Sequence, residues 1–355
     1  PTEAVSILRL ILGEPQPAGR RAELLTALGS GLARRGESVS GVLADSATPA
    51  PIRAAADRVF RQAVSNVAQS SAPTTERVSA AQLLGFAPSS VAVPALAGRL
   101  GPGDPPALQQ AAVASLAPHP APQTWAALLT NWRGHSPRLR SDIVDVLVQR
   151  PASAGLLLDA VAGGRVLIAD MTLEKRQLLI NNRNSKLRAR AAKLLAGIPT
   201  PDRAKVIARY TPALDKTGDA QAGAAVFKKL CAACHKVGTV GHKLGPDLNS
   251  VSNKSPRDLL INILDPNREA QPNFMTYTLV TVKGRVLTGI VAAETANTVT
   301  LTRAEGKQDI VARSQIEMLV SNGKSLMPEG LEKELSPQAL RDVVAWIKGL
   351  KSSIK

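Results

Sequence analysis

The chain is poor in cysteine and in aromatic residues. Its 355 residues include two cysteines, and Phe, Trp and Tyr together make up 3% of the total. With so few cysteines a disulfide-rich scaffold is excluded, and no disulfide remains if both thiols hold a cofactor. Ala, Leu and Val supply most of the apolar content, which favours helices packed closely through small side chains.

Acidic residues are also outnumbered. The chain has 44 Lys and Arg against 28 Asp and Glu, giving a formal net charge of +16. Such a balance leaves nucleic acid, an anionic surface or an acidic protein open as partners. The basic residues are scattered along expected helices and do not interleave with aromatic residues, so nucleic-acid binding is not expected. The length indicates two or three domains.

Two long uncharged stretches raise the question of a membrane span. They cover residues 78–98 and 105–132, but proline interrupts both, so they are better explained as buried helix pairs with turns. No transmembrane span is expected. The chain opens at Pro1 with no initiator Met and no apolar signal segment, so we expect a processed or truncated form.

A weak repeat runs through the first two hundred residues. Four amphipathic segments close with leucines, and these leucines are 32, 31 and 48 residues apart: Leu84, Leu116, Leu147 and Leu195. A helix, a turn and a second helix fit such a period, which indicates stacked helical hairpins. The pattern resembles HEAT repeats. An irregular helical bundle is the alternative.

Further along, the pattern changes twice. Residues 197–219 contain several prolines and are interpreted as a connector, and helices are expected at 220–230, 255–264 and 336–350. Between the last two, short β-rich runs separated by turn residues predict a small antiparallel sheet or barrel. These runs are residues 277–282, 285–291, 298–302 and 309–311.

Both cysteines lie in one pentapeptide, Cys231-Ala-Ala-Cys234-His235. C-x-x-C-H is the attachment signature of c-type haem, in which two thiols bond the porphyrin and the adjacent imidazole ligates the iron. A thiol redox pair and a zinc half site share the C-x-x-C spacing. His242 could supply a third zinc ligand, but a fourth is hard to find, because the other two histidines lie in the helical repeats.

Four methionines compete for the sixth position on the iron. Met327 is favoured, because Pro328 follows it and would stiffen a loop across the far haem face. A thioether is a soft ligand that stabilises ferrous iron, as an electron carrier needs. Met275 is the rival candidate, whereas Met318 is expected in a sheet core and Met171 in the helical repeats.

Three segments resemble a class I cytochrome c: Gly223-Ala-Ala-Val-Phe227, Gly245-Pro246-Asp247-Leu248 and Met327-Pro328. The resemblance implies one covalent haem c, attached at Cys231 and Cys234 and ligated by His235 and Met327. It also implies a haem pocket formed by Phe227, Gly245, Pro246, Leu248, Pro328 and Trp346.

The resemblance assigns roles within that pocket. In the family, a glycine and an aromatic residue of the first helix pack on an aromatic residue of the last helix, which corresponds here to Gly223, Phe227 and Trp346. The carbonyl of the loop proline, Pro246, accepts a hydrogen bond from the proximal imidazole, His235, and fixes its orientation. Leu248 packs against the porphyrin.

More narrowly, the order of the motifs CAACH, LGPDL, LLINILDPN and SLMPEGL resembles the haem-binding C-terminal domain of large secreted proteins from planctomycetes and verrucomicrobia. In those proteins a helical repeat region commonly precedes the cytochrome, often behind a dehydrogenase-like β-propeller. No propeller is present here, so its activity cannot be carried over. Residues 268–274 follow the family pattern only loosely.

The resulting fold class is mainly α: a HEAT-like α-solenoid followed by a class I cytochrome c fold with a small antiparallel β insertion. The expected domains are residues 1–212 for the repeats, 213–272 with 321–355 for the cytochrome, and 273–320 for the β insertion. The insertion either shields a haem edge, docks a partner or merely adds packing.

The function expected is a c-type cytochrome that passes single electrons from a dehydrogenase partner to an acceptor, as one part of a larger complex. Haem attachment to C-x-x-C-H takes place outside the cytoplasmic membrane, so a periplasmic or exported location is expected. Alternatives are a haem enzyme or gas sensor with an open sixth position, and a solenoid scaffold with an accessory haem. Four lysines near the motif either steer acidic partners or form a solvated face: Lys228, Lys229, Lys236 and Lys243.

Overall fold

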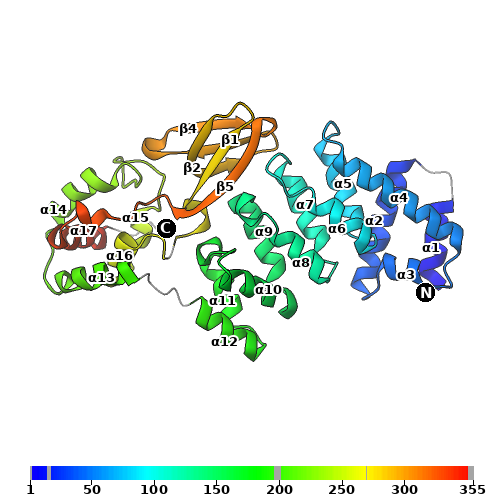
Figure 1. Cartoon of the computed structure of the whole chain (residues 1–355), viewed down its shortest axis with the longest axis horizontal. Coiled ribbons are helices and arrows are strands. Elements are labelled where there is room, and N and C mark those ends of the chain that lie inside the picture. Colours follow the sequence, from blue (N-terminus) through cyan, green and yellow to red (C-terminus); the bar gives the residue numbers. More distant parts are fainter. Residues whose placement is uncertain (1, 14–16, 196–200, 269, 351–355) are drawn as a thin grey trace. The chain divides into compact units, whose positions relative to one another are not determined.

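The computed structural model describes residues 2–13, 17–195, 201–268 and 270–350. It is mainly helical with one antiparallel sheet (Figure 1), which confirms the coarse fold class predicted from the sequence. The chain forms two compact units. One comprises Pro1–Leu157 with Thr295–Asn297, and the other Leu158–Glu294 with Thr298–Lys355.

The first unit consists of helices joined by short turns. They are α1 (Thr2–Gly13), α2 (Ala18–Arg34), α3 (Val39–Ala44), α4 (Ala50–Ala68), α5 (Thr74–Leu84), α6 (Ser89–Ala97), α7 (Pro106–Leu116), α8 (Pro122–Leu129), η1 (Trp132–Gly134), α9 (Pro137–Leu147) and α10 (Pro151–Ala162), the last running into the second unit. A proline stands at or next to the start of each helix from α4 to α10. Proline suits this place, because the first helical N–H groups have no partner within the helix.

The helices of this unit pack in two rows. Helix α5 packs on α7 and α7 on α9, while α4 packs on α6 and α6 on α8. Leu84, Leu116 and Leu147 end α5, α7 and α9 and are fully buried. The leucine spacing found in the sequence therefore corresponds to one pair of helices. Assignment of the pairs to the HEAT type stays a prediction. Within the described part of the chain, no helix is both long and apolar enough to span a membrane.

The second unit combines helices with the sheet. Its helices are η2 (Ile168–Asp170), α11 (Leu173–Ile180), α12 (Ser185–Leu194), α13 (Pro201–Tyr210), η3 (Thr211–Asp215), α14 (Ala220–Val226), η4 (Phe227–Cys231), α15 (Leu248–Val251), α16 (Pro256–Leu264), η5 (Pro272–Phe274), η6 (Ala304–Gly306), η7 (Arg313–Gln315), η8 (Leu331–Lys333) and α17 (Pro337–Gly349). The start of α17 is as predicted, with the Ser336 side chain accepting from the Ala339 N–H and Pro337 in the first turn.

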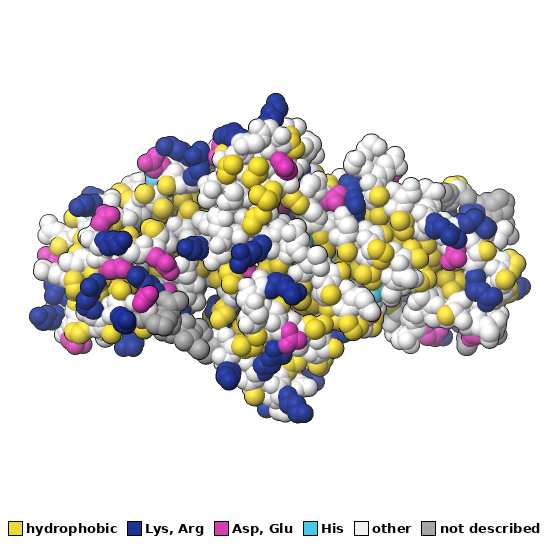
Figure 2. Space-filling model, viewed as in Figure 1, with side chains coloured by type: hydrophobic (Ala, Val, Ile, Leu, Met, Phe, Trp, Pro, Cys, Tyr) yellow, Lys and Arg dark blue, Asp and Glu magenta, His cyan; other side chains and the backbone are white. Residues whose placement is uncertain are grey.

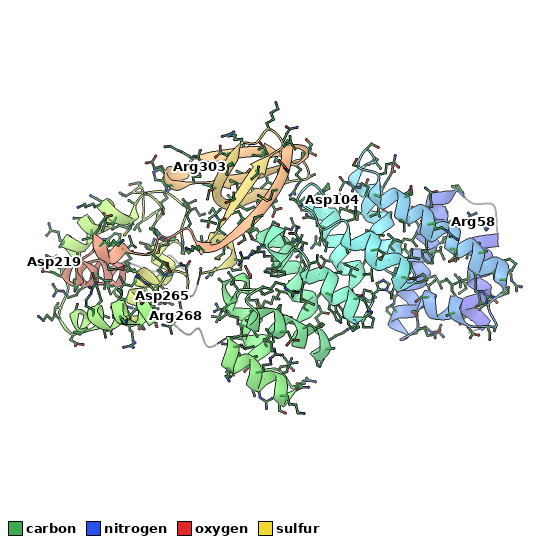
Figure 3. All side chains as sticks on the ribbon, in the orientation of Figure 1. Arg58, Asp104, Asp219, Asp265, Arg268 and Arg303 are labelled. Carbon is green, nitrogen blue, oxygen red and sulfur yellow. The ribbon has the colours of Figure 1, made fainter. Side chains whose placement is uncertain are left out.

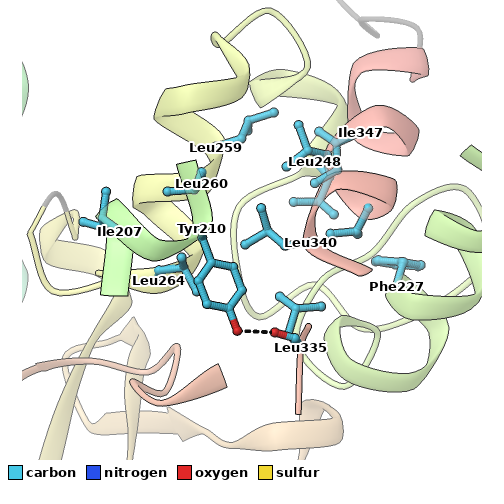
Figure 4. Close-up of a cluster of buried hydrophobic side chains, with 12 residues drawn as sticks. Ile207, Tyr210, Phe227, Leu248, Leu259, Leu260, Leu264, Leu335, Leu340 and Ile347 are labelled. Atoms are coloured by element: carbon cyan, nitrogen blue, oxygen red, sulfur yellow. Dashed lines mark hydrogen bonds between the residues drawn. The ribbon is translucent and has the colours of Figure 1, made fainter. Parts of the chain in front are cut away.

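One hydrophobic core joins α13, α14, α16 and α17 (Figure 4). Leu260, Leu340 and Val343 are buried there, as are Ile207 and Tyr210 of α13. The interpretation of residues 197–219 as a connector is therefore wrong for α13, whose apolar side chains cover this core. The prolines misled the prediction, because they open helices as readily as they end them. Residues 196–200 lie outside the described part.

The sheet has five antiparallel strands in the order β4-β3-β2-β1-β5. The strands are β1 (Met275–Thr281), β2 (Val286–Glu294), β3 (Thr298–Thr302), β4 (Gln308–Ala312) and β5 (Ile316–Ser325). Four of them were predicted as strands, whereas of β5 the sequence placed only Met318 and Leu319 in a strand pattern. Asn322-Gly323, usually a turn signal, lies inside β5, which pairs with β1 up to Met275↔Ser325. The β part thus continues beyond residue 320, and the three domain boundaries remain predictions.

Candidate haem site

The C-x-x-C-H segment forms a turn at the end of a capped helix. Asp219, labelled in Figure 3, caps α14 by accepting hydrogen bonds from the N–H groups of Gln221 and Ala222. The helix continues into the π-type turn η4, after which the N–H groups of Cys234 and His235 donate to the Cys231 carbonyl at 3.1 and 2.9 Å. Both cysteines and the histidine are thereby held in one tight turn.

His235 is oriented by the loop that follows it. Its Nδ1 lies 2.9 Å from the Pro246 carbonyl oxygen. A carbonyl can only accept, so Nδ1 carries the proton and Nε2 keeps its lone pair for a metal. Burial lowers the pKa of His235, with the Pro246 hydrogen bond acting in the opposite direction, and this favours the neutral ring that ligation requires.

A glycine lets this loop approach the imidazole. A Cβ atom on Gly245 would lie 2.5 Å from His235 Cε1, and the Gly245 N–H donates to the Cys234 carbonyl at 2.7 Å. The N–H of Leu244 donates to the same carbonyl at 2.9 Å. We call residues 231–246 the histidine loop, because its two ends fold back on each other around this ring.

Both thiols are free and partly buried. Burial raises the pKa of Cys231 to about 11, to which the neighbouring Cys234 contributes, and burial also raises the pKa of Cys234. Protonated thiols at neutral pH do not suit a reactive redox pair, which needs a thiolate. Among the described residues, no three His, Cys, Asp or Glu side chains gather as metal ligands.

The helix pair expected behind the motif is present. The rings of Phe227 and Trp346 stack with centroids 4.5 Å apart and an interplanar angle of 30°. A Cβ atom on Gly223 would clash with the Asp342 carbonyl and lie 2.8 Å from the Cβ of Trp346. The glycine therefore allows α14 and α17 to touch. Leu248 is buried in the same core.

Met327 lies half-buried in the irregular segment between β5 and α17. We call residues 325–332 the methionine loop. The Leu326 N–H donates to the Phe274 carbonyl at 2.9 Å, and the Met327 N–H donates to the Ser325 Oγ at 3.2 Å. Pro328, the next residue, is exposed.

The other methionines occupy different surroundings. Met275 is 2% exposed in the core of the sheet, and Met171 is buried in the second unit. Met318 is 44% exposed, so its predicted place in the sheet core is wrong. It faces outward because Leu319, the next residue, takes the inward position, and a register shift between Ile316 and Met318 leaves both Glu317 and Met318 exposed.

The methionine loop is anchored by residues that the sequence did not single out. The guanidinium of Arg203 in α13 binds both carboxylate oxygens of Glu332, at 3.1 and 2.9 Å. Their hydrogen bond lowers the pKa of Glu332 and raises that of Arg203. The Tyr210 hydroxyl lies 3.1 Å from the Glu332 carbonyl oxygen, and 2.7 Å from the carbonyl oxygen of Leu335 just beyond the loop (Figure 4). Tyr210 is one of only two tyrosines, and this was the one available sequence signal.

The β part touches the histidine loop at one turn. The N–H of Glu305, in the turn between β3 and β4, donates to the Ala233 carbonyl at 3.1 Å. The turn begins after Arg303, labelled in Figure 3, and both Glu305 and Gly306 adopt positive φ. The β3–β4 turn is therefore hydrogen-bonded to the C-x-x-C-H segment itself.

The four lysines near the motif are exposed: Lys228, Lys229, Lys236 and Lys243. On the face shown in Figure 2, Lys and Arg side chains are dispersed among acidic and apolar ones and form no continuous block.

Comparison with known proteins identifies the class of this region. Residues 218–282 match the family model described as cytochrome C oxidase, cbb3-type, subunit III. No curated protein matches the chain at a significant level. The match covers the helix before the motif, the histidine loop and α16. It supports a cytochrome c haem-binding domain in this part of the chain, and hence haem-based electron transfer.

Proposed function

We propose that the chain is a c-type cytochrome with one covalent haem, attached through Cys231 and Cys234 and ligated by His235 and Met327. The observation that carries the proposal is the 2.9 Å contact between His235 Nδ1 and the Pro246 carbonyl, directly behind two free thiols. This contact leaves Nε2 available to iron, which is the tautomer that an axial histidine needs.

When bound, haem supplies a one-electron Fe(III)/Fe(II) couple. The chain's own residues hold it. The two cysteines fix its edge, Pro246 keeps the His235 ring in one orientation, and Gly245 allows the loop to close on that ring. Met327 supplies the second axial ligand, and a soft thioether favours the reduced state.

The wider role of the cytochrome is proposed from the motif, the order of the segments and the exposed charges. A periplasmic or exported location follows from where C-x-x-C-H haem attachment takes place. The motif order supports a relation to the haem-binding domains of secreted planctomycete and verrucomicrobial proteins. A dehydrogenase donor and a separate acceptor are proposed on the same ground, and the exposed lysines favour acidic surfaces on those partners. The helical pairs of the first unit support HEAT-like repeats that hold the cytochrome in a larger complex.

The optical spectrum of the haem-loaded protein tests the axial ligands. We expect a low-spin ferric spectrum with the weak far-red charge-transfer band typical of methionine bound to haem iron. Met327→Ala should lose this band and keep covalent haem, whereas Met318→Ala, which changes an exposed methionine, should match the wild type. A high-spin ferric spectrum in the wild type would contradict the proposal and favour an enzyme or sensor with an open position.

A further inference from the structure

Asn267, in the segment after α16, joins the two sides of Met327 through its side-chain amide. Its Oδ1 accepts a hydrogen bond from the Ser325 N–H at 2.7 Å, and its Nδ2 donates to the Glu329 carboxylate at 2.7 Å. Ser325 and Glu329 stand two residues before and two residues after Met327. One side chain thus spans the segment that carries the proposed ligand.

The backbone around Met327 is held by single hydrogen bonds and not by a ladder. Strand β5 ends at Ser325, beyond which Leu326 still donates to the Phe274 carbonyl. Met327 donates to the Ser325 hydroxyl, and Pro328 has no N–H to donate. The place of Met327 therefore depends on how firmly Ser325 and the residues after Pro328 are fixed, and Asn267 acts on both.

The chemistry of this contact requires an amide. Asn267 accepts at one atom and donates at the other, whereas an aspartate would offer acceptors only. An aspartate would keep the bond from the Ser325 N–H but would place its second oxygen against the Glu329 carboxylate. The two hydrogen bonds also differ in the free energy they contribute. The Ser325 contact is partly buried and contributes more, whereas the Glu329 contact is exposed to solvent.

We propose that Asn267 is a positioning residue that holds Met327 in place to ligate the haem iron. The inference rests on the proposed function, in which Met327 is the sixth ligand. A thioether binds iron weakly, so the fraction of bound methionine depends on how well the chain pre-organises it. Loss of the Asn267 contacts should free the methionine loop and raise the population in which the sixth position is open.

The experiment uses the full haem-loaded chain and added imidazole, which displaces methionine from ferric iron. The far-red band gives the imidazole concentration at half-displacement. The variants are Asn267→Ala and Asn267→Asp. Asn322→Ala is the matched control. The Asn322 amide also accepts one hydrogen bond, from the Thr278 hydroxyl, and donates one, to the Thr276 hydroxyl. Asn322 lies in β5, five residues before Met327.

We expect Asn267→Ala to lower the half-displacing concentration about tenfold, which corresponds to about 1.4 kcal/mol. Most of this loss comes from the partly buried Ser325 contact, since the exposed Glu329 contact contributes little. Asn267→Asp should lower the half-displacing concentration by a smaller factor, because it keeps the bond from the Ser325 N–H. This variant also tests the proposal if the alanine variant fails to fold. Asn322→Ala should titrate like the wild type. Amide exchange at Ser325 should accelerate in Asn267→Ala alone, which gives a readout independent of the iron.

The Met327→Ala protein distinguishes a wrong ligand assignment from a wrong role for Asn267. If that variant keeps the far-red band, the ligand assignment is wrong and the inference is overturned with it. If it loses the band while both Asn267 variants titrate like Asn322→Ala, the inference alone is overturned and the proposed function stands.

Discussion

The histidine loop and the methionine loop are held in different ways. In the histidine loop, Cys234 and His235 bond to residues 244–246, at most eleven positions further along the chain. In the methionine loop, the anchors are Arg203, Asn267 and Phe274, which are 52 to 129 positions from their partners. One proposed ligand is therefore held by its own neighbourhood, and the other by the assembled fold.

The difference has a thermodynamic consequence. Local contacts form at small entropic cost, while contacts between distant segments need the loops between them to close first. The methionine loop should therefore respond to changes in α13, the segment after α16 and the sheet, whereas the histidine loop should respond mainly to changes within itself. The predictions below test this contrast.

The largest effect is expected for Arg203→Ala. The change leaves the Glu332 carboxylate, only 10% exposed, without its bidentate partner. Breaking a fully buried pair at one side costs about 3–5 kcal/mol, and the partial exposure of both side chains reduces this to about 2.5 kcal/mol. Thermal or urea unfolding measures the loss. The control is Arg190→Ala, whose pair with Asp159 is more than 40% exposed at both side chains, and it should lose under about 1 kcal/mol. Equal losses of unfolding free energy in the two variants would show that the Arg203–Glu332 pair stabilises the fold no more than an exposed pair does.

Gly245→Ala tests the histidine loop from within. The new Cβ would lie 2.5 Å from His235 Cε1, and this ring is fixed by Pro246 and cannot swing away freely. Overpacking of this kind costs about 1–3 kcal/mol, and we expect about 2 kcal/mol by urea unfolding. Gly349→Ala is the control, since nothing lies near that position. A Gly245→Ala protein as stable as the control would show that the loop closes less tightly on the imidazole than the structure indicates.

The number of residues between two contacting groups decides how much of each loop could be predicted from the sequence. The C-x-x-C-H signature and the LGPDL segment lie close together in sequence, so the pairing of His235 with Pro246 could be expected from the resemblance. The stacking of Phe227 on Trp346 could also be expected although the two residues lie far apart in sequence, because the resemblance assigns them this contact.

The anchors of the methionine loop had no such signal. Arg203 and Tyr210 lie in a segment interpreted as a connector because of its prolines, and α13 forms there because its apolar side chains complete a core assembled from other helices. The second half of β5 was missed for another reason. Its Asn322-Gly323 pair indicates a turn, and Gly323 does adopt a φ of +69°, but the strand accommodates it as a register shift and pairs with β1 again at Ser325. Tertiary contacts decide how these segments fold, and the short apolar period of Val206, Ile207 and Tyr210 in α13 was outweighed by the prolines around it.

The pH dependence of stability tests the anchor of the methionine loop at Glu332. Hydrogen bonding from Arg203 lowers the pKa of Glu332, so the folded state favours the ionised carboxylate. Its contribution is complete above the ordinary glutamate pKa of about 4.3 and is lost as the pH falls through the lowered value. Wild-type stability should therefore decrease below about pH 4 more than that of Glu332→Gln, by about 1 kcal/mol in urea unfolding at several pH values. Parallel pH profiles for the two proteins would contradict this.

The smallest expected effect concerns the contact of the histidine loop with the β3–β4 turn, where the Glu305 N–H donates to the Ala233 carbonyl. Gly306, next to Glu305, has a φ of +71°, so Gly306→Ala should strain the β3–β4 turn by about 1 kcal/mol. Gly284→Ala is the matched control, because Gly284 has a φ of +76° in another hairpin of the same sheet and nothing near it. Both variants should lose similar global stability, but amide exchange at Glu305 should accelerate only in Gly306→Ala.

If the far-red band and the imidazole titration then stay as in the wild type, the histidine loop holds its ligand without the β part. A marked change in either would show that this loop, too, depends on the assembled fold.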